Sequence, residues 1–441
     1  MKFFFFLIVL FTFVSCSSKK SELEIDIDNL KKEGRVFIEK KISTNESDNI
    51  NSIKNFHPFP EANSTYSFDW NYPYLNSSNY LSHFKLVTEL KILKKEEINY
   101  VSSKNNLFEK NILYHNKKII FIDDFSNLLI IDSNFTLIKK YQIHPKSSFD
   151  KYPLKFSLLA ESGILYIADN LGYILAYDLN NFSILWKINL NVPFFSNLAI
   201  FDKDIFVTNS NGKIFSINKL TGKQNWSFET GTSSLKSYNA FKIGIYNDKL
   251  LFSNDLGVLY CINLSSQSIA WSINLPESIT QTSREFLKLS PLVLYNNFLY
   301  VVSNYGKFTK VNLNNGKITW SVDVISSNIP IINPTSAIIV DENHYFLSID
   351  INNGKILYKN KLSDLLKLKN KNINKTNFNN IFLASNKIYI TTTDGYFFSI
   401  DVKDLDNVNF KKISESINSN VLINDNNIFF LDKIGTIFKI K

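Results

Sequence analysis

A fifteen-residue pattern that opens on glycine and closes on tryptophan recurs along this chain of 441 residues. One copy, GKIFSINKLTGKQNW, passes through a short alternating run, turns at Thr221-Gly222 and ends at the tryptophan. In each of four copies the tryptophan lies fourteen positions after the glycine, although the chain has only 5 tryptophans. So strict a spacing indicates one structural unit used several times. The four copies are 172–186, 212–226, 257–271 and 306–320.

Weaker copies extend the pattern over most of the chain. Asn127 and His344 stand where the other copies have glycine, the copy at Gly395 carries one extra residue, and the copy at Gly435 is cut short by the C-terminus. The first positions of successive copies are 38 to 51 residues apart. Repeats of about 40–50 residues are typical of propellers and other arrays, in which each unit buries its faces against its neighbours.

Each repeat carries the signals of a four-stranded antiparallel sheet. Apolar runs rich in β-branched and aromatic residues precede the glycine, and several alternate as half-buried strands do. Asn211-Gly212 and Asp394-Gly395 suit tight hairpins. A second turn precedes the tryptophan strand, and one more strand upstream completes a propeller blade. We predict an all-β fold, an eight-bladed β-propeller of four-stranded antiparallel blades; seven blades are the alternative, because the copies at 127 and 344 are weak.

The repeated tryptophans have a structural interpretation. A blade cannot bury its own faces, so a large ring at a fixed position of the blade would wedge between adjacent sheets. The pattern therefore predicts an inter-blade structural role, and stacking on a ligand is the alternative. The residues concerned are Trp186, Trp226, Trp271 and Trp320.

The first residues have the features of a lipoprotein signal. A nearly unbroken apolar run ends at Val14; it is too short to span a bilayer and is typical of a signal-peptide core. Ser15 then precedes Cys16, as small residues do in bacterial lipoprotein signals, although Phe13 stands where leucine is usual. We predict that 1–15 form a lipoprotein signal peptide and that Cys16 is lipidated. The alternative is an ordinary signal peptide with a chance cysteine.

Lipidation at Cys16 would place the mature chain at a membrane. An acyl chain contributes about 0.8 kcal/mol of membrane binding per buried methylene. By resemblance to bacterial sorting rules, Ser17 after the cysteine favours the outer membrane, facing the periplasm. The other cysteine, Cys261, lies in a repeat strand and is interpreted as a small buried apolar residue. With Cys16 acylated, no disulfide is expected within the chain.

The rest of the chain divides into a tether and a propeller. Residues 16–66 are rich in Ser, Asn, Lys, Asp and Glu, which is typical of a mostly flexible segment. Residues 67–441 contain the repeats and are assigned to the propeller domain. The stretch FKLVTELKIL at 84–93 alternates as a strand does, and the last repeat is incomplete. We therefore predict that 84–93 complete the final blade and close the ring.

Composition and motifs favour neither nucleic-acid binding nor catalysis. The formal net charge is +9, but the lysines are spread along the chain, so a solvated basic surface is preferred. The 5 histidines lack metal-ligand spacing, and no carboxylate cluster suits calcium. His344 in a glycine position and Asp123-Asp124 at a strand end are interpreted as turn residues. We expect no nucleic-acid partner, no enzyme activity, no metal and no cofactor.

Together, the lipoprotein signal, the tether and the tryptophan-bearing repeats resemble the BamB family, lipoproteins of the outer-membrane β-barrel assembly machinery. The repeats resemble pyrroloquinoline-quinone-type propeller repeats, and the segment around Trp70 resembles the entry segment of alphaproteobacterial members. The resemblance implies a non-catalytic scaffold that binds the periplasmic domains of the barrel insertase, as a monomer within a hetero-complex. It is more specific for architecture than for function, because a fold does not fix a function.

The resemblance also implies which loops bind the partner. One family loop lies between the third and fourth blades and corresponds to 229–241, where its leucine and basic residue fall on Leu235 and Lys236. A second family loop carries acidic residues ahead of the next blade. It corresponds to 282–291, where only Glu285 is close to that position. These three residues are the expected contacts with the insertase.

Two other functions stay open at this point. Quinoprotein dehydrogenases share the repeat and hold a quinone over calcium, but many carry an adjacent-cysteine disulfide, and this chain has no cysteine pair. An envelope propeller could instead bind another ligand, a glycan or a peptide, because recognition by propellers resides in loops.

Overall fold

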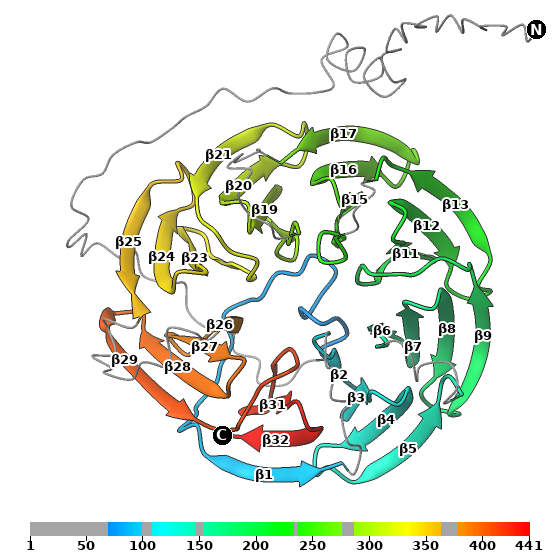
Figure 1. Cartoon of the computed structure of the whole chain (residues 1–441), viewed down its shortest axis with the longest axis horizontal. Coiled ribbons are helices and arrows are strands. Elements are labelled where there is room, and N and C mark those ends of the chain that lie inside the picture. Colours follow the sequence, from blue (N-terminus) through cyan, green and yellow to red (C-terminus); the bar gives the residue numbers. More distant parts are fainter. Residues whose placement is uncertain (1–68, 99–107, 146–152, 233–236, 276–285, 363–376) are drawn as a thin grey trace, which may run out of the picture. The chain divides into compact units, whose positions relative to one another are not determined.

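Eight separate four-stranded sheets make up the regular structure of the described residues. The structure is a computed structural model that describes residues 69–98, 108–145, 153–232, 237–275, 286–362 and 377–441. Within the unit Glu39–Lys441, the sheets stand around a common axis, each with one strand near the axis and one at the rim (Figure 1). The predicted eight-bladed propeller is confirmed, and the seven-bladed alternative is wrong.

Every sheet is an antiparallel meander, and we number the blades in chain order from the first complete one. The strands of blades one to four are β2 (Ile112–His115), β3 (Lys118–Ile122), β4 (Asn127–Asp132), β5 (Leu137–Gln142); β6 (Phe156–Glu161), β7 (Ile164–Asp169), β8 (Tyr173–Asp178), β9 (Ser183–Asn189); β10 (Ala199–Phe201), β11 (Asp204–Thr208), β12 (Lys213–Asn218), β13 (Gln224–Glu229); β14 (Ile243–Tyr246), β15 (Lys249–Ser253), β16 (Val258–Asn263) and β17 (Ser268–Asn274). The strands of blades five to eight are β18 (Val293–Tyr295), β19 (Phe298–Ser303), β20 (Lys307–Asn312), β21 (Ile318–Asp323); β22 (Ile331–Ile332), β23 (Ser336–Val340), β24 (Tyr345–Asp350), β25 (Ile356–Lys361); β26 (Phe378–Ala384), β27 (Lys387–Thr392), β28 (Tyr396–Asp401), β29 (Asp404–Lys412); β30 (Leu422–Asn424), β31 (Asn427–Leu431), β32 (Thr436–Ile440) and β1 (Ile92–Glu97).

The antiparallel order gives the propeller two different faces. The turns between the second and third strands and the connections from one blade to the next all lie on one face, which we call the loop face. The turns after the first and third strands lie on the opposite face. The first strand of each blade is the inner strand, and it begins on the loop face (Figure 1).

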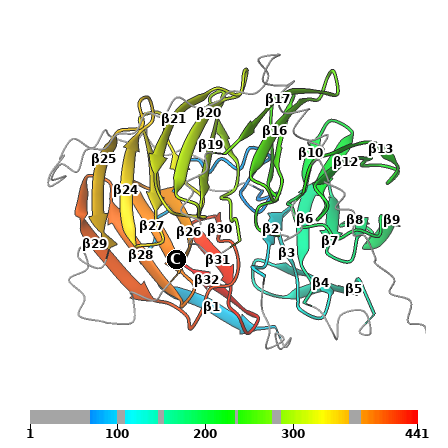
Figure 2. The ribbon, with the colours of Figure 1, turned by 45° about the horizontal axis from the view of Figure 1, so that its top comes forward.

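β1 closes the ring. It pairs antiparallel with β32, so blade eight takes three strands from the C-terminus and its rim strand from the N-terminal side. β1 and β32 lie side by side in both views (Figure 1, Figure 2). Just before β1, the backbone groups of Lys91 and Lys441 exchange two hydrogen bonds of 2.6 and 2.9 Å. The closing strand joins the two ends of the propeller and covers a sheet edge that would otherwise be open.

The closing strand does not lie where the sequence pattern placed it, at 84–93. Only the last two residues of that stretch belong to β1, and Leu90 has a φ of +53°, which interrupts an extended strand. The alternation has another cause. Phe84, Leu86 and Leu90 are buried because this stretch packs on blades seven and eight, and Phe84 pairs in parallel with Ala384 of β26.

An entry segment, 69–91, crosses the propeller on the face opposite the loop face. The Trp70 indole Nε1 donates to the Ile423 carbonyl at 2.8 Å, and the backbone of Trp70 pairs with Tyr114. In Figure 1 the segment runs through the centre of the ring. It therefore ties together blades that lie far apart around the ring. The inner-strand residues that bond with it are Tyr114, Ala160, Ile245, Leu294, Leu383 and Ile423.

A residue of positive φ stands before the third strand of every blade. Glycine supplies it in six blades, and His344 (φ +67°) and Ser126 (φ +63°) supply it in the others. His344 is therefore a turn residue, as predicted. The first copy of the repeat begins at Ser126 rather than at Asn127. In that blade Lys139, not Tyr141, occupies the ladder position of the tryptophans, because the turn before it is one residue shorter.

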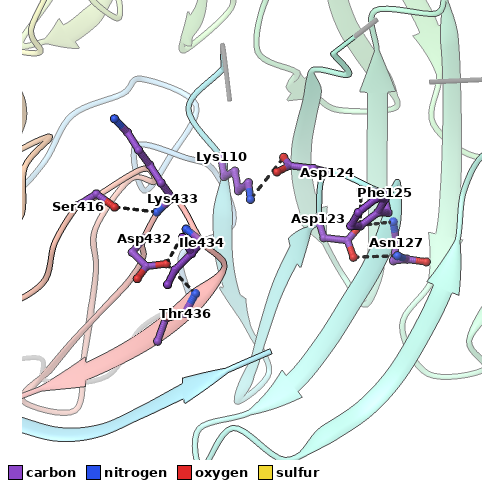
Figure 3. Close-up of polar contacts among 10 residues, drawn as sticks. All are labelled: Lys110, Asp123, Asp124, Phe125, Asn127, Ser416, Asp432, Lys433, Ile434 and Thr436. Carbon is purple, nitrogen blue, oxygen red and sulfur yellow. Dashed lines mark hydrogen bonds and ion pairs between the residues drawn. The ribbon is translucent and has the colours of Figure 1, made fainter. Parts of the chain in front are cut away.

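Side-chain oxygens cap many of these turns. Asp123 Oδ1 accepts hydrogen bonds from the backbone amides of Phe125 (2.9 Å) and Asn127 (2.8 Å), which confirms the turn role predicted for Asp123 (Figure 3). Asp432 does the same in blade eight. An aspartate or asparagine that bonds to its own following backbone stabilises such a turn locally.

Ionic contacts also cross the seam between blades eight and one. Lys110 Nζ lies 3.4 Å from the carboxylate of Asp124, and Figure 3 shows this pair beside the Asp432 turn. Burial raises the pKa of Asp432, and Lys110 opposes that rise. Lys110 therefore faces carboxylates of both blades that the ring closure brings together.

Candidate docking surface

Four large apolar side chains are exposed on the loop face of blades four to six. Leu256 and Tyr305 lie in the turns before β16 and β20, whereas Phe286 and Ile325 lie in the connections to blades five and six. Their exposed fractions are 45, 37, 55 and 41%. We call these four residues the loop-face patch. Contiguous exposed apolar surface often marks an interaction site.

Hydrogen bonds hold the segments of this patch against one another. The Asn304 side chain donates to the Phe286 carbonyl at 3.0 Å, which places Phe286 beside the turn that carries Tyr305. The amide of the residue before Ile325 donates to Gly306 of the same turn at 3.1 Å. Phe286, Tyr305 and Ile325 are therefore neighbours on a surface that is fixed before any partner arrives.

The connection between blades three and four joins the same surface. Leu289 donates its amide to the Asn239 carbonyl at 3.3 Å, and the Ser237 hydroxyl donates to the Leu287 carbonyl. Tyr238, between Ser237 and Asn239, is 43% exposed. The loops that resemblance singled out in the sequence thus lie against each other where the structure describes them.

The predicted partner contacts themselves lie outside the described residues. This applies to Leu235 and Lys236, which immediately precede Ser237, and to Glu285, which immediately precedes Phe286. The predicted lipidation site, Cys16, also lies outside them. Their roles stay predictions.

The four repeat tryptophans lie at junctions between blades. Trp271 and Trp320 are buried, whereas Trp186 and Trp226 are half-buried. In three of them the indole Nε1 donates to a backbone carbonyl of the next blade, at 2.9 to 3.0 Å. The three acceptors are Lys219, Leu313 and Ile351.

The sequence interpretation missed all four residues of the loop-face patch. A signal for two of them was present, because Leu256 and Tyr305 occupy the turn position that Asn211 and Asp394 hold in other repeats. An apolar residue at a turn position is unusual. Phe286 and Ile325 carry no comparable signal, since nothing in an irregular connection indicates which side chain faces solvent.

Three of the histidines hold parts of the fold together. His83 Nε2 accepts the backbone amide of Asn386 at 3.0 Å. His144 Nε2 lies 2.6 Å from Asp169 Oδ2 in a buried pair that links blades one and two. Burial lowers the pKa of His115, whose Nδ1 contacts Asn71 of the entry segment at 2.7 Å. Among the described residues, no group of three or more His, Cys, Asp or Glu side chains could hold a metal ion.

The repeats also match a protein family. Two overlapping stretches, 153–360 and 242–441, match the family model described as outer membrane protein assembly factor BamB, and together they span more than half of the chain. The chain belongs to the BamB family. No helix in the described part of this BamB-family chain is long and apolar enough to cross a membrane.

Two relatives named outer membrane protein assembly factor BamB share limited identity with the chain. The protein of Moranella endobia (strain PCIT) is 20% identical over 263 residues, which are 57% of this chain and 63% of that protein. The protein of Legionella pneumophila (strain Paris) is 24% identical over 148 residues, 34% of this chain and 35% of that protein. Each match thus spans less than two thirds of the relative's length.

Solved structures show the same architecture. BamB from Moraxella catarrhalis superposes with a TM-score of 0.65 at 11% identity, covering 79% of this chain and 99% of that one. A quinohemoprotein alcohol dehydrogenase from Comamonas testosteroni gives 0.61 at 8% identity, covering 84% and 80%. At such identities the likeness shows the fold alone, and membership of the BamB family rests on the family model.

Proposed function

We propose that this chain is a non-catalytic scaffold of outer-membrane β-barrel assembly, held by a lipid on Cys16 at the periplasmic side of the outer membrane, which docks the periplasmic domains of the barrel insertase. Its family supports the assembly role, since the family and two relatives are described as outer membrane protein assembly factors. The observation that carries the docking role is the loop-face patch.

The patch has the chemistry of a protein-binding surface. Interfaces concentrate their energy in a few aromatic and apolar anchors surrounded by polar groups. Phe286 and Tyr305 are such anchors, and the Asn304 bond to the Phe286 carbonyl pre-organises them at the surface. Pre-organised contacts lose less conformational entropy when a partner binds. The predicted contacts Leu235, Lys236 and Glu285 adjoin this surface in sequence.

A binding experiment tests the docking role. The full chain and its Phe286→Ala/Tyr305→Ala variant are titrated with the purified periplasmic domains of the insertase from the same cell. We expect the variant to bind more than tenfold more weakly, a loss of about 1.4 kcal/mol. Leu220→Ala is the matched control, because Leu220 is 68% exposed but lies on the opposite face. Equal affinities of parent and patch variant would remove the patch from the interface.

A second pair of variants tests the contacts carried over from the family. Leu235→Ala/Lys236→Glu and Glu285→Lys are titrated in the same way, after circular dichroism has shown that both fold. A folded variant that binds as tightly as the parent would remove its loop from the interface. Purification of the native lipoprotein from membranes then separates the functions: co-purified insertase supports the scaffold, and co-purified glycan supports a different envelope ligand.

A further inference from the structure

Three charged side chains from different blades face one another where the inner strands begin on the loop face. Glu109 precedes β2, Lys155 precedes β6 and Lys242 precedes β14. Lys155 and Lys242 repel each other, and both attract Glu109. Two ammonium groups therefore share one carboxylate, and the three groups carry one net positive charge when all are ionised.

Aromatic rings surround these charges. Lys155 Nζ donates to the Phe195 carbonyl at 2.7 Å and lies 5.5 Å from the centroid of the Phe195 ring and 5.8 Å from that of Phe108. Tyr238 stacks on Phe195 with ring centroids 4.0 Å apart and remains 43% exposed. We call the whole set the hub cluster. Its members are Phe108, Glu109, Lys155, Phe195, Tyr238 and Lys242.

The charged groups are reachable by solvent and yet poorly solvated. Glu109 is exposed, and Lys155 and Lys242 are half-buried. The surrounding protein nevertheless raises the pKa of Glu109 to about 7 and lowers the pKa of Lys155 to about 7 and that of Lys242 to about 8. Burial is the main cause of all three shifts. A ligand that brought a negative charge would stabilise both ammonium groups.

The entry segment lies on the other side of this cluster. Burial raises the pKa of the Tyr74 hydroxyl, and the negative charge of Glu109 raises it further, so Tyr74 faces Glu109 from the entry segment. Since that segment crosses the opposite face, a ligand would approach from the loop face. There the exposed edge of Tyr238 stands nearest to solvent.

We propose that the hub cluster binds a carboxylate carried on an aromatic group, either a small aromatic acid or the C-terminal end of a peptide. The two lysines supply charge-assisted hydrogen bonds to the carboxylate, and the stacked Phe195 and Tyr238 rings supply a face for the aromatic group. Glu109 disfavours the ligand while it is ionised. This binding is separate from docking at the loop-face patch.

Calorimetric titration of the full chain with N-acetylphenylalanine, and with its uncharged amide as the matched control ligand, tests the proposal. We expect the acid to bind at least about tenfold more tightly than the amide, as expected for loss of a charge-assisted contact. A tetrapeptide ending in a free phenylalanine distinguishes the sources: tighter binding than the single residue indicates a peptide end, and equal binding indicates a small acid. Equal binding of acid and amide, or binding of neither, would overturn the proposal.

Variants assign the site to the cluster. Lys155→Met and Lys242→Met should each weaken binding of the acid by about tenfold, whereas Lys203→Met, an exposed lysine on the opposite face, should not change it. Glu109→Gln should bind the acid more tightly than the parent at pH 8. Since Glu109→Gln is nearly isosteric, it gives a result even if a lysine variant fails to fold. Unchanged affinity in Glu109→Gln and in the folded lysine variants would place the acid elsewhere.

The pH dependence gives an independent readout. The affinity for the acid should fall between about pH 6 and 9, because Lys155 and Lys242 lose their protons and Glu109 becomes charged in this range. Tyr74 stays protonated there, since its pKa is raised, and the ligand carboxylate, with a pKa of about 3.5, stays ionised. Binding that is independent of pH would contradict a role for these groups.

Discussion

The indole of Trp271 in blade four lies flat against Gly316 in blade five. A Cβ atom added to Gly316 would come within 2.7 Å of the indole Cδ2 atom, and the Trp271 Nε1 donates to the neighbouring Leu313 carbonyl at 2.9 Å. The same pairing joins Trp186 to Gly222 and Trp320 to Gly354. Each of these glycines gives its turn a positive φ and also leaves room for the ring of the preceding blade.

Gly316→Ala should therefore destabilise the propeller at one junction. The new methyl group would collide with the indole, and the backbone φ of +70° adds strain of about 1–3 kcal/mol for a residue with a side chain. Chemical unfolding measures the loss. Gly231→Ala is the matched control, because its nearest neighbour, Leu256 Cδ1, would lie at an ordinary 3.5 Å. If both variants unfold at the same denaturant concentration as the parent, the close packing at Gly316 has no energetic weight.

Removing the rings should have unequal effects. Trp271 is 3% exposed, so Trp271→Ala should cost about 3–5 kcal/mol. Trp226 is half-buried, and Gln267 with a φ of +51° stands where the next blade would otherwise carry the glycine. Trp226→Ala should therefore cost less than Trp271→Ala. Unfolding midpoints compare the two, and a larger loss for Trp226 would contradict this account of the wedge.

The fold was predictable because its signal is local and repeated. Glycine, turn and tryptophan recur at fixed spacing, and each sets one piece of a blade. The pairing of Trp271 with Gly316 was not predictable, because Gly316 already had a sufficient explanation as a turn residue. The closing strand was misplaced for a similar reason: Phe84 and Leu86 alternate because they pack on inner strands, and alternation does not reveal which partner a residue faces.

The candidate sites were harder to predict, since they depend on contacts between distant loops. Leu256 and Tyr305 gave a signal as apolar turn residues, but their proximity to Phe286 follows only from the hydrogen bonds between segments. The hub cluster had no sequence signal at all. Glu109 and Lys155 lie in ordinary connections, and the circular arrangement of inner strands brings them together.

Cys16→Ala should abolish lipidation. The acyl chain is attached to the thiol, so the variant should remain unprocessed at the inner membrane or appear in the soluble envelope fraction. Labelling of cells with a fatty-acid probe, followed by fractionation, measures both outcomes. Cys261→Ala is the control, because Cys261 is buried in a strand and should not affect labelling. Continued labelling of the Cys16 variant would contradict lipidation at this residue.

The closing strand should be required for a closed, monomeric propeller. Replacing Ile92–Glu97 by a Gly/Ser segment of equal length removes the rim strand of blade eight and exposes the edge of β32, which invites aggregation. Thermal melting and size-exclusion chromatography measure the loss. The register gives a control: oxidation should join cysteines at Glu97 and Thr436, which are ladder partners, and not cysteines at Glu97 and Phe438. An unchanged melt of the replaced chain would show that β1 is dispensable.

Stability should depend on pH through the hub cluster, with opposite slopes in two windows. Lys155 and Lys242 have pKa values of about 7 and 8 in the fold, below the ordinary 10.5, so between about pH 7 and 10 the unfolded chain binds more protons and stability rises with pH. Glu109, raised from 4.5 to about 7, binds its proton more tightly in the fold, so its contribution falls as pH rises from about 4.5 to 7. Chemical unfolding of the parent at a series of pH values, compared with Lys155→Met/Lys242→Met and with Glu109→Gln, separates the two windows. The lysine variant should lose the rise above pH 7 and keep the fall below it, and Glu109→Gln should do the reverse. Parallel pH profiles in all three proteins would show that these groups are solvated as fully in the fold as in the unfolded chain.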